Sequence, residues 1–410
     1  MKQILVYENW RSETPTLIGR LFVEGTRGKE VCSFEYDSKW LKQSSGFILD
    51  PDLSLFNGRQ FAPVGKELFG IFEDSCPDRW GRTLMDRREM ILARSESRKP
   101  RSLTESDYLL GVHDMSRMGA LRFKTEESGQ FLSDNSDLAA PPWVALRKLN
   151  DAVANFEKDP NKADKWMQML IAPGSSLGGA RPKANVVAPD GSLWIAKFPS
   201  KKDKINCSAW EKTTYELAKM CGLSVVDCCL EKFSKFGSTF LVKRFDRELD
   251  RRIHFTSAMA LLGCTDGDYD SGYLDIAAFI KSSGVSPKKD LLELWKRIVF
   301  NILISNTDDH LRNHGFLLTE KGWTLSPLFD VNPNPYGENL SLNISETDSS
   351  LSIDLAISVC EFFGVKSTVA KSTIAEMKKI VKENWSSIAT SNGISRSEQS
   401  FMESAFVESK

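Results

Sequence analysis

The sequence lacks long hydrophobic runs, paired cysteine motifs and a large charge of either sign. Its most apolar stretch, 298–304, is interrupted by Asn301 and is far shorter than the roughly 20 residues of a membrane-spanning helix. The eight cysteines include no C-x-x-C pair, and the N-terminus shows no signal-peptide core, so we expect reduced thiols. A net charge of −1 gives no overall attraction for nucleic acid or anionic lipid. We therefore expect a cytoplasmic protein without membrane contact.

The 410 residues, 41% of them hydrophobic and 27% charged, have the composition of a globular protein with two or three structural units. Alternating apolar residues and turn signals predict strands at 3–7, 16–23, 31–36, 183–188, 192–198, 230–233, 239–242, 315–318 and 323–325. Helical spacing predicts helices in 79–101, 208–220, 290–305 and the tail from Asp354. A strand-rich part followed by a helical part indicates an α+β fold, with a ligand cleft between the lobes.

Four features of the sequence suggest nucleotide chemistry. The first is the segment 174–183, GSSLGGARPK, whose small residues let backbone N–H groups approach phosphate oxygens. It is not a P-loop, because Ala180 and Arg181 stand where that motif needs Lys and Ser/Thr, and a strand follows instead of a helix. A glycine-rich loop joining two strands over a nucleotide, as in protein kinases, fits better. A flexible turn is the alternative.

The second feature is Lys197, which ends a predicted strand after that loop. In protein kinases a lysine on the equivalent strand reaches the nucleotide phosphates, and a glutamate on the following helix holds it. Glu211 lies early in the predicted helix 208–220 and is suitably placed for this. The alternatives are an edge-strand lysine with its charge in water and a surface glutamate.

The third and fourth features follow the buried helix 290–305. Asp308 and Asn313 are five residues apart, which is the spacing of the base and the metal-binding amide in a kinase catalytic loop. Asp330 lies beyond a predicted two-stranded hairpin, where a kinase keeps its second metal ligand, and its carboxylate is a hard donor suited to Mg²⁺. A solvated polar loop is the alternative for 306–313, but the order and spacing of all four features favour a kinase.

These residues resemble HipA-type bacterial serine/threonine kinases, the toxins of HipBA toxin–antitoxin pairs. The resemblance covers essentially the whole chain. Its motifs are FEDSCPDRWGR at 72–82, S-x-GGA-x-x-K at 176–183, VKRFDR at 242–247, NTD-x-H-x-x-N at 306–313 and FDV at 329–331. It implies a bilobal protein-kinase-like fold with an N-terminal mixed α/β subdomain at 1–125, a kinase N-lobe at 126–248 and a mainly helical C-lobe at 249–410.

The resemblance also implies residue roles. Asp308 is the expected catalytic base, Asn313 and Asp330 the expected Mg²⁺ ligands, and Lys197, held by Glu211, the expected contact to the α/β-phosphates. The remaining residues expected to bind ATP are Gly178, Gly179, Ala180, Arg181, Pro182 and Lys183 over the phosphates, Lys243, Arg244 and Phe245 at the adenine, and Asp246 and His310 near the ribose or phosphates. Lys243 stands where the best-known relatives have an acidic residue. We expect this difference to be tolerated, because backbone groups recognise the adenine.

Ser176 occupies the position that family members autophosphorylate, a modification that dislodges the glycine-rich loop and inactivates the kinase. Ser175 beside it is the alternative acceptor. Phosphate on Ser176 adds about −1.5 to −2 charge near Arg181 and Lys183. We therefore expect autophosphorylation to weaken ATP binding.

The resemblance implies a growth-arrest toxin that phosphorylates a protein of the translation machinery, such as an aminoacyl-tRNA synthetase, with a link to persistence. It also implies a HipB-like helix-turn-helix antitoxin, with DNA contacted only through that partner. The alternative is a kinase-shaped binding module that acts mainly as a co-repressor. A pseudokinase, however, usually lacks at least one residue of a set that is complete here, namely Lys197, Asp308, Asn313 and Asp330. The basic segment 79–101 is either a solvated helix face or a contact for the antitoxin or its DNA.

Two metal-like patterns are set aside. His310 and His314 have an H-x3-H spacing without a cysteine pair or third ligand, so they are interpreted as hydrogen-bonded loop histidines. The acidic run 266–270 lacks the glycine and the final glutamate of a calcium-binding EF-hand and is interpreted as a solvated loop.

Overall fold

The computed structural model describes residues 1–26, 29–43, 47–132, 140–158, 169–170, 179, 181–234, 237–248, 251–268 and 270–409. The chain divides into two compact units. Unit 1 consists of Met1–Lys201 and Lys243–Thr256, and unit 2 of Lys202–Val242 and Ser257–Lys410. Segment 202–242 therefore groups with the C-terminal half, and the three-part division at residues 125 and 248 stays a prediction.

Unit 1 contains a five-stranded antiparallel sheet with the order β4-β3-β2-β1-β5. Its strands are β1 (Lys2–Glu8), β2 (Thr16–Thr26), β3 (Lys29–Tyr36), β4 (Gln60–Phe61) and β5 (Leu121–Lys124). The three strands predicted near the N-terminus are confirmed. Aromatic side chains from this sheet and from the segment after it pack in the core, where Phe72 contacts both Phe34 and Phe123.

The helices of unit 1 are α1 (Ser38–Gln43), α2 (Gly70–Glu73), α3 (Arg79–Ser95), α4 (Glu105–Gly111), the short η1 (Trp143–Ala145) and α6 (Leu146–Lys158). The arginine-rich helix α3 buries Trp80, Leu84 and Met85 and exposes arginines on its other side, which is compatible with both interpretations of the basic segment. It ends at Ser95, two residues before Ser97, whose φ of +53° lies in the left-handed region and does not continue a right-handed helix.

Strands β6 (Lys183–Val187) and β7 (Leu193–Lys197) form the predicted hairpin of unit 1. Gly191 in its turn has φ +83°, a left-handed conformation that glycine adopts without a steric penalty. The register places Lys183 directly opposite Lys197. The short strands β10 (Arg247–Glu248) and β11 (Arg251–Arg252) follow later in the same unit, whose last residue, Thr256, lies in β12 (Phe255–Ser257).

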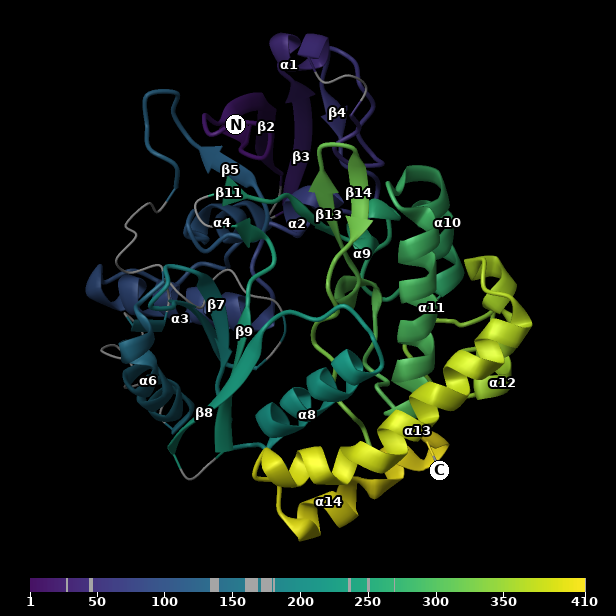
Figure 1. Cartoon of the computed structure of the whole chain (residues 1–410). Coiled ribbons are helices and arrows are strands. Elements are labelled where there is room, and N and C mark those ends of the chain that lie inside the picture. Colours follow the sequence, from purple (N-terminus) through teal and green to yellow (C-terminus); the bar gives the residue numbers. More distant parts are fainter. Residues whose placement is uncertain are drawn as a thin grey trace. The chain divides into compact units, whose positions relative to one another are not determined.

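Unit 2 begins with helix α8 (Cys207–Met220) and the hairpin of β8 (Cys228–Ser234) and β9 (Gly237–Lys243). Its further elements are α9 (Ala258–Leu261), α10 (Tyr273–Ser283), α11 (Pro287–Leu303), η3 (Leu311–Asn313), β13 (Gly315–Thr319), β14 (Gly322–Leu325), α12 (Ile353–Ser358), η4 (Cys360–Phe363), α13 (Ser367–Ser391), α14 (Arg396–Met402) and η5 (Glu403–Ser409). Helix α11 is almost entirely buried, as its sequence predicts, and lies beside α10 (Figure 1).

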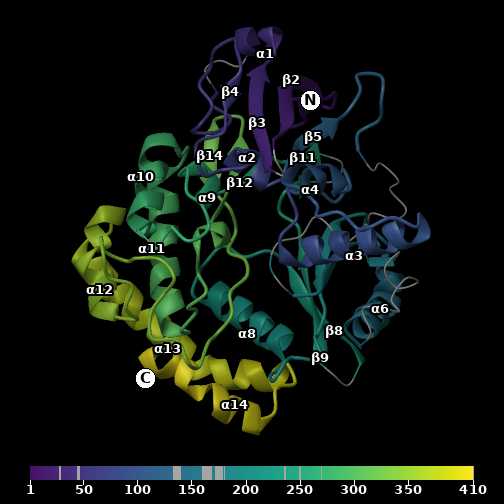
Figure 2. The ribbon, with the colours of Figure 1, turned by 180° about the vertical axis from the view of Figure 1, so that it is seen from behind.

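The C-terminal helices brace α8 inside unit 2. The long helix α13 runs along α8, as the view from behind also shows (Figure 2). Trp210 of α8 stacks on Trp385 of α13, with ring centroids 6.4 Å apart, and Asn392 donates a hydrogen bond to Thr213. These contacts explain why segment 202–242 groups with the C-terminal half of the chain.

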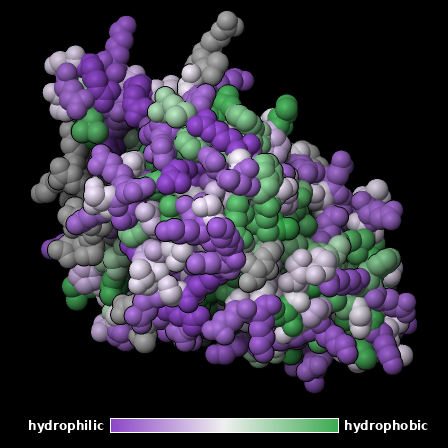
Figure 3. Space-filling model, turned by 90° about the horizontal axis from the view of Figure 1, so that it is seen from above, coloured by the Kyte–Doolittle hydropathy of each residue, from purple (hydrophilic) through white to green (hydrophobic). Residues whose placement is uncertain are grey.

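Hydrophilic side chains cover most of the face shown in Figure 3, with hydrophobic ones interspersed among them. Within the described residues, no helix combines the length and the apolarity that a membrane crossing requires. All eight cysteines are free thiols, in agreement with the absence of cysteine motifs.

Candidate active site

The loop after α11 carries Asp308 and Asn313 in unit 2. Asp308 is exposed, whereas the side chain of Asn313 is buried. The Asn313 amide nitrogen donates to the backbone oxygen of Asp308 at 2.9 Å, and the Asn313 backbone N–H donates to His310 at 2.8 Å. An amide has separate donor and acceptor ends, so this contact turns the Asn313 nitrogen toward the loop and leaves its oxygen for other partners.

A cluster of buried polar side chains holds this loop in place. The carboxylate of Asp309 accepts hydrogen bonds from the Tyr273 hydroxyl of α10, from Asn301 of α11 at 2.7 Å and from His314 at 2.8 Å. Burial acts to raise the pKa of Asp309, but the nearby His314 and the Tyr273 hydrogen bond outweigh it and hold that pKa below its usual range. Asp308 and Asp309 therefore have opposite environments, one exposed and one completely enclosed.

The sequence did not reveal this cluster as functional. Asp309 was visible only as a neighbour of Asp308, and its partners are up to 36 residues away along the chain. His314 is fully buried against Asp309, which confirms that it is a hydrogen-bonded histidine. Among the residues that the structure describes, no three histidine, cysteine or acidic side chains gather as a metal site, and Asp266 pairs with Arg312 in an exposed loop.

Asp330 follows β14 and has φ +55°, a left-handed conformation that is unusual for a residue with a side chain. Helix α8 lies against it. Burial and the negative charges of Glu211 and Asp330 raise the pKa of Tyr215 well above its usual value, and Tyr215 also bonds the backbone of Asp330. The carboxylates of Glu211 and Asp330 therefore both lie near Tyr215.

Side chains and backbone also join the Asp330 segment to the Asp308 loop. Asn334 donates to the Thr307 hydroxyl at 2.7 Å, and its backbone N–H donates to Ser305 at 3.1 Å. Ser305 itself has φ +50°. Four of the predicted residues, Glu211, Asp308, Asn313 and Asp330, thus belong to unit 2, where they come from three separate segments of the chain.

The donors present in unit 2 fit a magnesium ion that is bound together with phosphates. Asn313 offers an amide oxygen and Asp330 a carboxylate, both hard oxygen ligands. Mg²⁺ in nucleotide sites typically takes only one or two protein carboxylates and completes its shell with phosphate and water. A cluster of three acidic side chains is therefore not required.

Unit 1 holds the predicted phosphate-contacting lysine. Lys197 is only 8% exposed and pairs across the β6–β7 hairpin with Lys183, which is 5% exposed. This burial overturns the alternative of an edge-strand lysine with its charge in water. Glu211 is likewise buried, at 3% exposure, and is not a surface glutamate.

Arg244 and Asp246 face the interior of unit 1, and the carboxylate of Asp246 has no exposed surface. It accepts hydrogen bonds from Arg244 and Arg247, at distances of 2.6 to 2.8 Å, and from the backbone of Gly119. Burial acts to raise the pKa of Asp246, but Arg244 and Arg247 outweigh it and lower that pKa.

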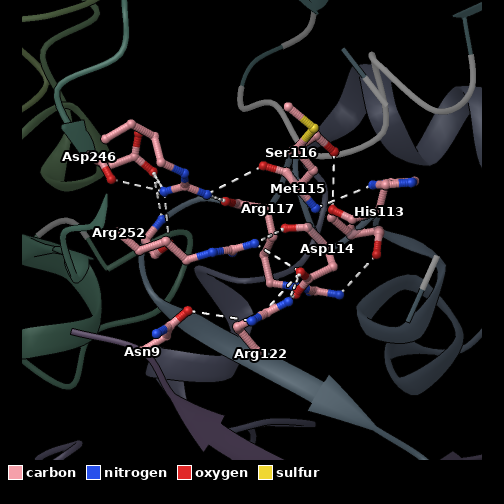
Figure 4. A network of polar contacts seen from close by, with 12 residues as sticks. Asn9, His113, Asp114, Met115, Ser116, Arg117, Arg122, Asp246 and Arg252 are labelled. Carbon is pink, nitrogen blue, oxygen red and sulfur yellow. Dashed lines mark hydrogen bonds and ion pairs between the residues drawn. The ribbon is translucent and has the colours of Figure 1, made fainter. Parts of the chain in front are cut away.

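The network around Asp246 extends to Asp114, which pairs with Arg122 and Arg252 (Figure 4). The half-buried Lys243 and Phe245 alternate with the two buried residues Arg244 and Asp246. The structure therefore gives Arg244 and Asp246 interior partners, and their predicted contacts with a nucleotide stay predictions. Gly178, Ala180, Ser175 and Ser176 lie outside the described residues.

The comparisons with known proteins identify relatives. The family model described as HipA-like C-terminal domain matches residues 175–385, slightly more than half of the chain. "Putative kinase Y4mE" of Sinorhizobium fredii is 29% identical over 182 residues, which cover 38% of this chain and 41% of that protein. A "Putative kinase" of Haemophilus influenzae is 26% identical over 189 residues, covering 40% and 54%. The matches thus span about half the length of these curated relatives.

One solved structure resembles the whole chain. It is HipA of Shewanella oneidensis from a complex of HipA, HipB and operator DNA, with a TM-score of 0.66 and 16% identity, covering 99% of this chain and 95% of that one. At this identity the likeness is one of fold. It confirms the α+β class and the HipA-like fold expected from the sequence.

Proposed function

Because the chain belongs to the family with a HipA-like C-terminal domain, we propose that it is an ATP-dependent serine/threonine protein kinase. The observation that supports this most is the arrangement inside unit 2. Asp308 and Asn313 occupy one loop, and Asn334 hydrogen bonds this loop to the segment that carries Asp330. Phosphoryl transfer needs such a set, because its catalysis depends on positioning and charge stabilisation more than on covalent chemistry.

In this proposal Asp308 orients the acceptor hydroxyl and accepts its proton, for which its exposed carboxylate is accessible. Asn313 and Asp330 hold Mg²⁺, which neutralises charge on the phosphates when it is bound. Lys197, which is 8% exposed, contacts the phosphates. Lys243 and Phe245 bind the adenine through backbone groups.

The biological role is proposed from the family. We propose that the chain arrests growth by phosphorylating a component of the translation machinery, and that autophosphorylation at Ser176 inactivates it. A HipB-like helix-turn-helix antitoxin is the proposed partner, with DNA contacted only through it. The HipA of Shewanella oneidensis was solved with HipB and operator DNA.

Replacing Asp308 by Asn tests the proposal. A general base contributes about 10²- to 10⁴-fold to a rate, so Asp308→Asn should reduce phosphate incorporation from γ-labelled ATP by that factor. Because Asp308 is exposed, its replacement should change the free energy of unfolding by less than about 0.5 kcal/mol and leave ATP binding intact. Asp270→Asn, an exposed aspartate elsewhere in unit 2, is the control.

Undiminished labelling by Asp308→Asn would refute Asp308 as the base. Absence of both labelling and ATP binding in the unaltered protein, together with binding to an antitoxin–DNA complex, would instead support the co-repressor alternative. Phosphoproteomics after brief induction of the unaltered chain and of Asp308→Asn would identify the acceptor protein.

A further inference from the structure

The N-terminal end of helix α3 holds the end of the glycine-rich segment within unit 1. Asp78 is the N-cap of α3, and one of its carboxylate oxygens accepts the Arg79 N–H at 2.7 Å. The other oxygen accepts the backbone N–H of Gly179 at 2.5 Å. The backbone N–H of Trp80 in turn donates to the carbonyl oxygen of Gly179 at 3.1 Å. Both backbone polar groups of Gly179 therefore bond to α3.

Trp80 makes a second contact with the same segment. Its indole N–H donates to the carbonyl oxygen of Lys183 at 2.9 Å, in a buried environment. The Trp80 ring is 5% exposed and packs edge-on against Phe156 of α6, with ring centroids 5.7 Å apart. Packing fixes the ring and hence the direction of its N–H group, so the position of Lys183 is set by a side chain that has little freedom to move.

Lys183 connects this anchor to Lys197. The two lysines are paired in the β6–β7 register, and the Phe198 N–H beside Lys197 donates to the Pro182 oxygen at 2.9 Å. Gly179 has φ +83°, which a residue with a side chain rarely adopts, so its backbone course depends on glycine. Hydrogen bonds from Asp78 and Trp80 thus hold Gly179 and Lys183, and Lys183 lies directly opposite the lysine expected at the phosphates.

We propose that Asp78 and Trp80 are positioning residues that fix Gly179, Lys183 and, through them, Lys197 relative to the ATP phosphates. The inference rests on the proposed kinase function and assigns a role to a part of the chain that lies outside the matched domain at 175–385. The N–H of Gly179 is used by Asp78, so Gly179 serves as an anchor of the loop rather than as a phosphate ligand. Asp78 and Trp80 touch neither nucleotide nor acceptor in this scheme.

Two substitutions separate positioning from folding. Asp78→Ser keeps a good N-cap residue for α3, but Arg79 and Gly179 bond to different carboxylate oxygens of Asp78, and serine retains a single oxygen that is neutral, so the bond to Gly179 should be lost or weakened. Trp80→Phe keeps a ring against Phe156 and removes the indole donor together with part of the ring volume, a loss that a second Trp→Phe substitution can control for. Trp194→Phe is the matched control, because Trp194 lies in the same hairpin with one indole hydrogen bond, to Ser192, and one edge-on partner, Trp143.

The readouts are the Kd for ATP–Mg²⁺ by calorimetry, the KM for ATP and kcat with casein as a generic acceptor, and hydrogen exchange of peptides covering 179–183. Losing one such hydrogen bond is expected to raise Kd and KM about twofold to tenfold in Asp78→Ser and Trp80→Phe. We expect kcat to change by less than about twofold. Exchange at 179–183 should become faster, and Trp194→Phe should match the unaltered protein.

Unchanged Kd and exchange in both variants would overturn the inference while leaving the kinase proposal intact. An equal effect of Trp194→Phe would overturn it as well, since any loosening of the hairpin would then suffice. If the unaltered protein itself bound no ATP–Mg²⁺, the proposed function would fail, and the inference with it.

Discussion

The hydroxyl of Thr214 lies 2.6 Å from the carbonyl oxygen of Val331, so helix α8 is bonded to the residue directly after Asp330. The same hydroxyl is 2.9 Å from the Glu211 oxygen of its own helix. A hydroxyl donates one proton, and the shorter contact is the one across segments. Together with Tyr215, this bond fixes the backbone of a candidate metal ligand from the helix that also carries Glu211.

Thr214→Val tests whether this hydrogen bond supports phosphate transfer beyond its contribution to the stability of the fold. The substitution leaves the buried Val331 oxygen without its donor, so we expect a loss of about 1 to 3 kcal/mol in the free energy of unfolding. Phosphate transfer should fall as well, because Asp330 is less well held. Thr213→Val is the control, since the hydroxyl of Thr213 donates to Ala209 within α8 and not to the Asp330 segment. Equal losses of transfer in both variants, measured at equal folded fraction, would contradict the link.

Asp309→Asn should destabilise the catalytic loop. An asparagine presents an NH₂ group to donors that now meet a carboxylate, and hydrogen bonds to a charged group contribute about 1.5 to 3 kcal/mol each. The lowered pKa of Asp309 also sets the direction of the pH dependence. The stabilisation that ionised Asp309 contributes to folding is present above the usual pKa of 3.8, and it is lost as pH falls through the lower pKa of the folded protein.

Urea unfolding of Asp309→Asn at pH 7 and below pH 4 measures both effects. The difference from the unaltered protein should be largest at pH 7 and shrink in acid. Asp308→Asn, at the exposed neighbouring position, is the comparison and should change the free energy of unfolding at pH 7 by less than about 0.5 kcal/mol. A difference that does not depend on pH would mean that folding leaves the pKa of Asp309 unchanged, against the lowered value expected here.

His254 should make unit 1 sensitive to acid. Burial lowers its pKa from 6.5 to about 3, and its ring stacks on Trp10 at 4.5 Å. A base with a lowered folded pKa binds more protons when unfolded, so its contribution is complete above pH 6.5 and is lost as pH falls toward 3. His254→Phe keeps a ring on Trp10 and removes the titrating group.

The measurement is the difference in unfolding free energy between His254→Phe and the unaltered protein across pH 3 to 7. That difference should move in favour of the variant as pH falls. Taking the difference matters because burial raises the pKa of Asp50 to about 6, which gives an opposite pH dependence that is common to both proteins. A flat difference would show that His254 is accessible to protons in the folded state.

Glu398 should contribute to stability through one oxygen. Its Oε1 accepts both the Asn206 backbone N–H at 2.7 Å and the Trp210 indole N–H at 2.9 Å, joining α14 to the start of α8. Glu398→Ala should therefore cost about 1 to 3 kcal/mol of unfolding free energy. Glu398→Gln retains a carbonyl oxygen and should cost less. Thermal unfolding followed by tryptophan fluorescence distinguishes them, and identical losses would argue against the shared acceptor.

Much of the fold could be predicted from local pattern. The Asp-Gly turn predicted the β6–β7 hairpin, and the apolar periodicity of 290–305 predicted the buried helix α11, because both signals arise within a few residues. The assignment of segment 202–242 to unit 2 could not be foreseen. It depends on side chains such as Glu398 and Trp385, which lie nearly 200 residues after the helix they brace.

The candidate site divides in the same way. The spacing of Asp308 and Asn313 indicated a kinase-type loop from the sequence alone, because the two residues are only five positions apart. The direction of the side chains of Arg244 and Asp246 was not predictable, because a motif does not say which of its alternating residues face inward. The residues that hold the candidate site in place, such as Asp309 and Asp78, were not predictable either, because in the sequence they are ordinary acidic residues.

The sequence by itself determined several of the helices and hairpins and the identities of the groups proposed to transfer a phosphate, because these follow from short-range spacing and side-chain chemistry. Tertiary structure alone decided which polar groups hold those residues in place. Tyr273 reaches Asp309 and Trp80 reaches Lys183 only after folding has brought distant segments together, and a buried hydrogen bond depends on that approach rather than on distance along the chain.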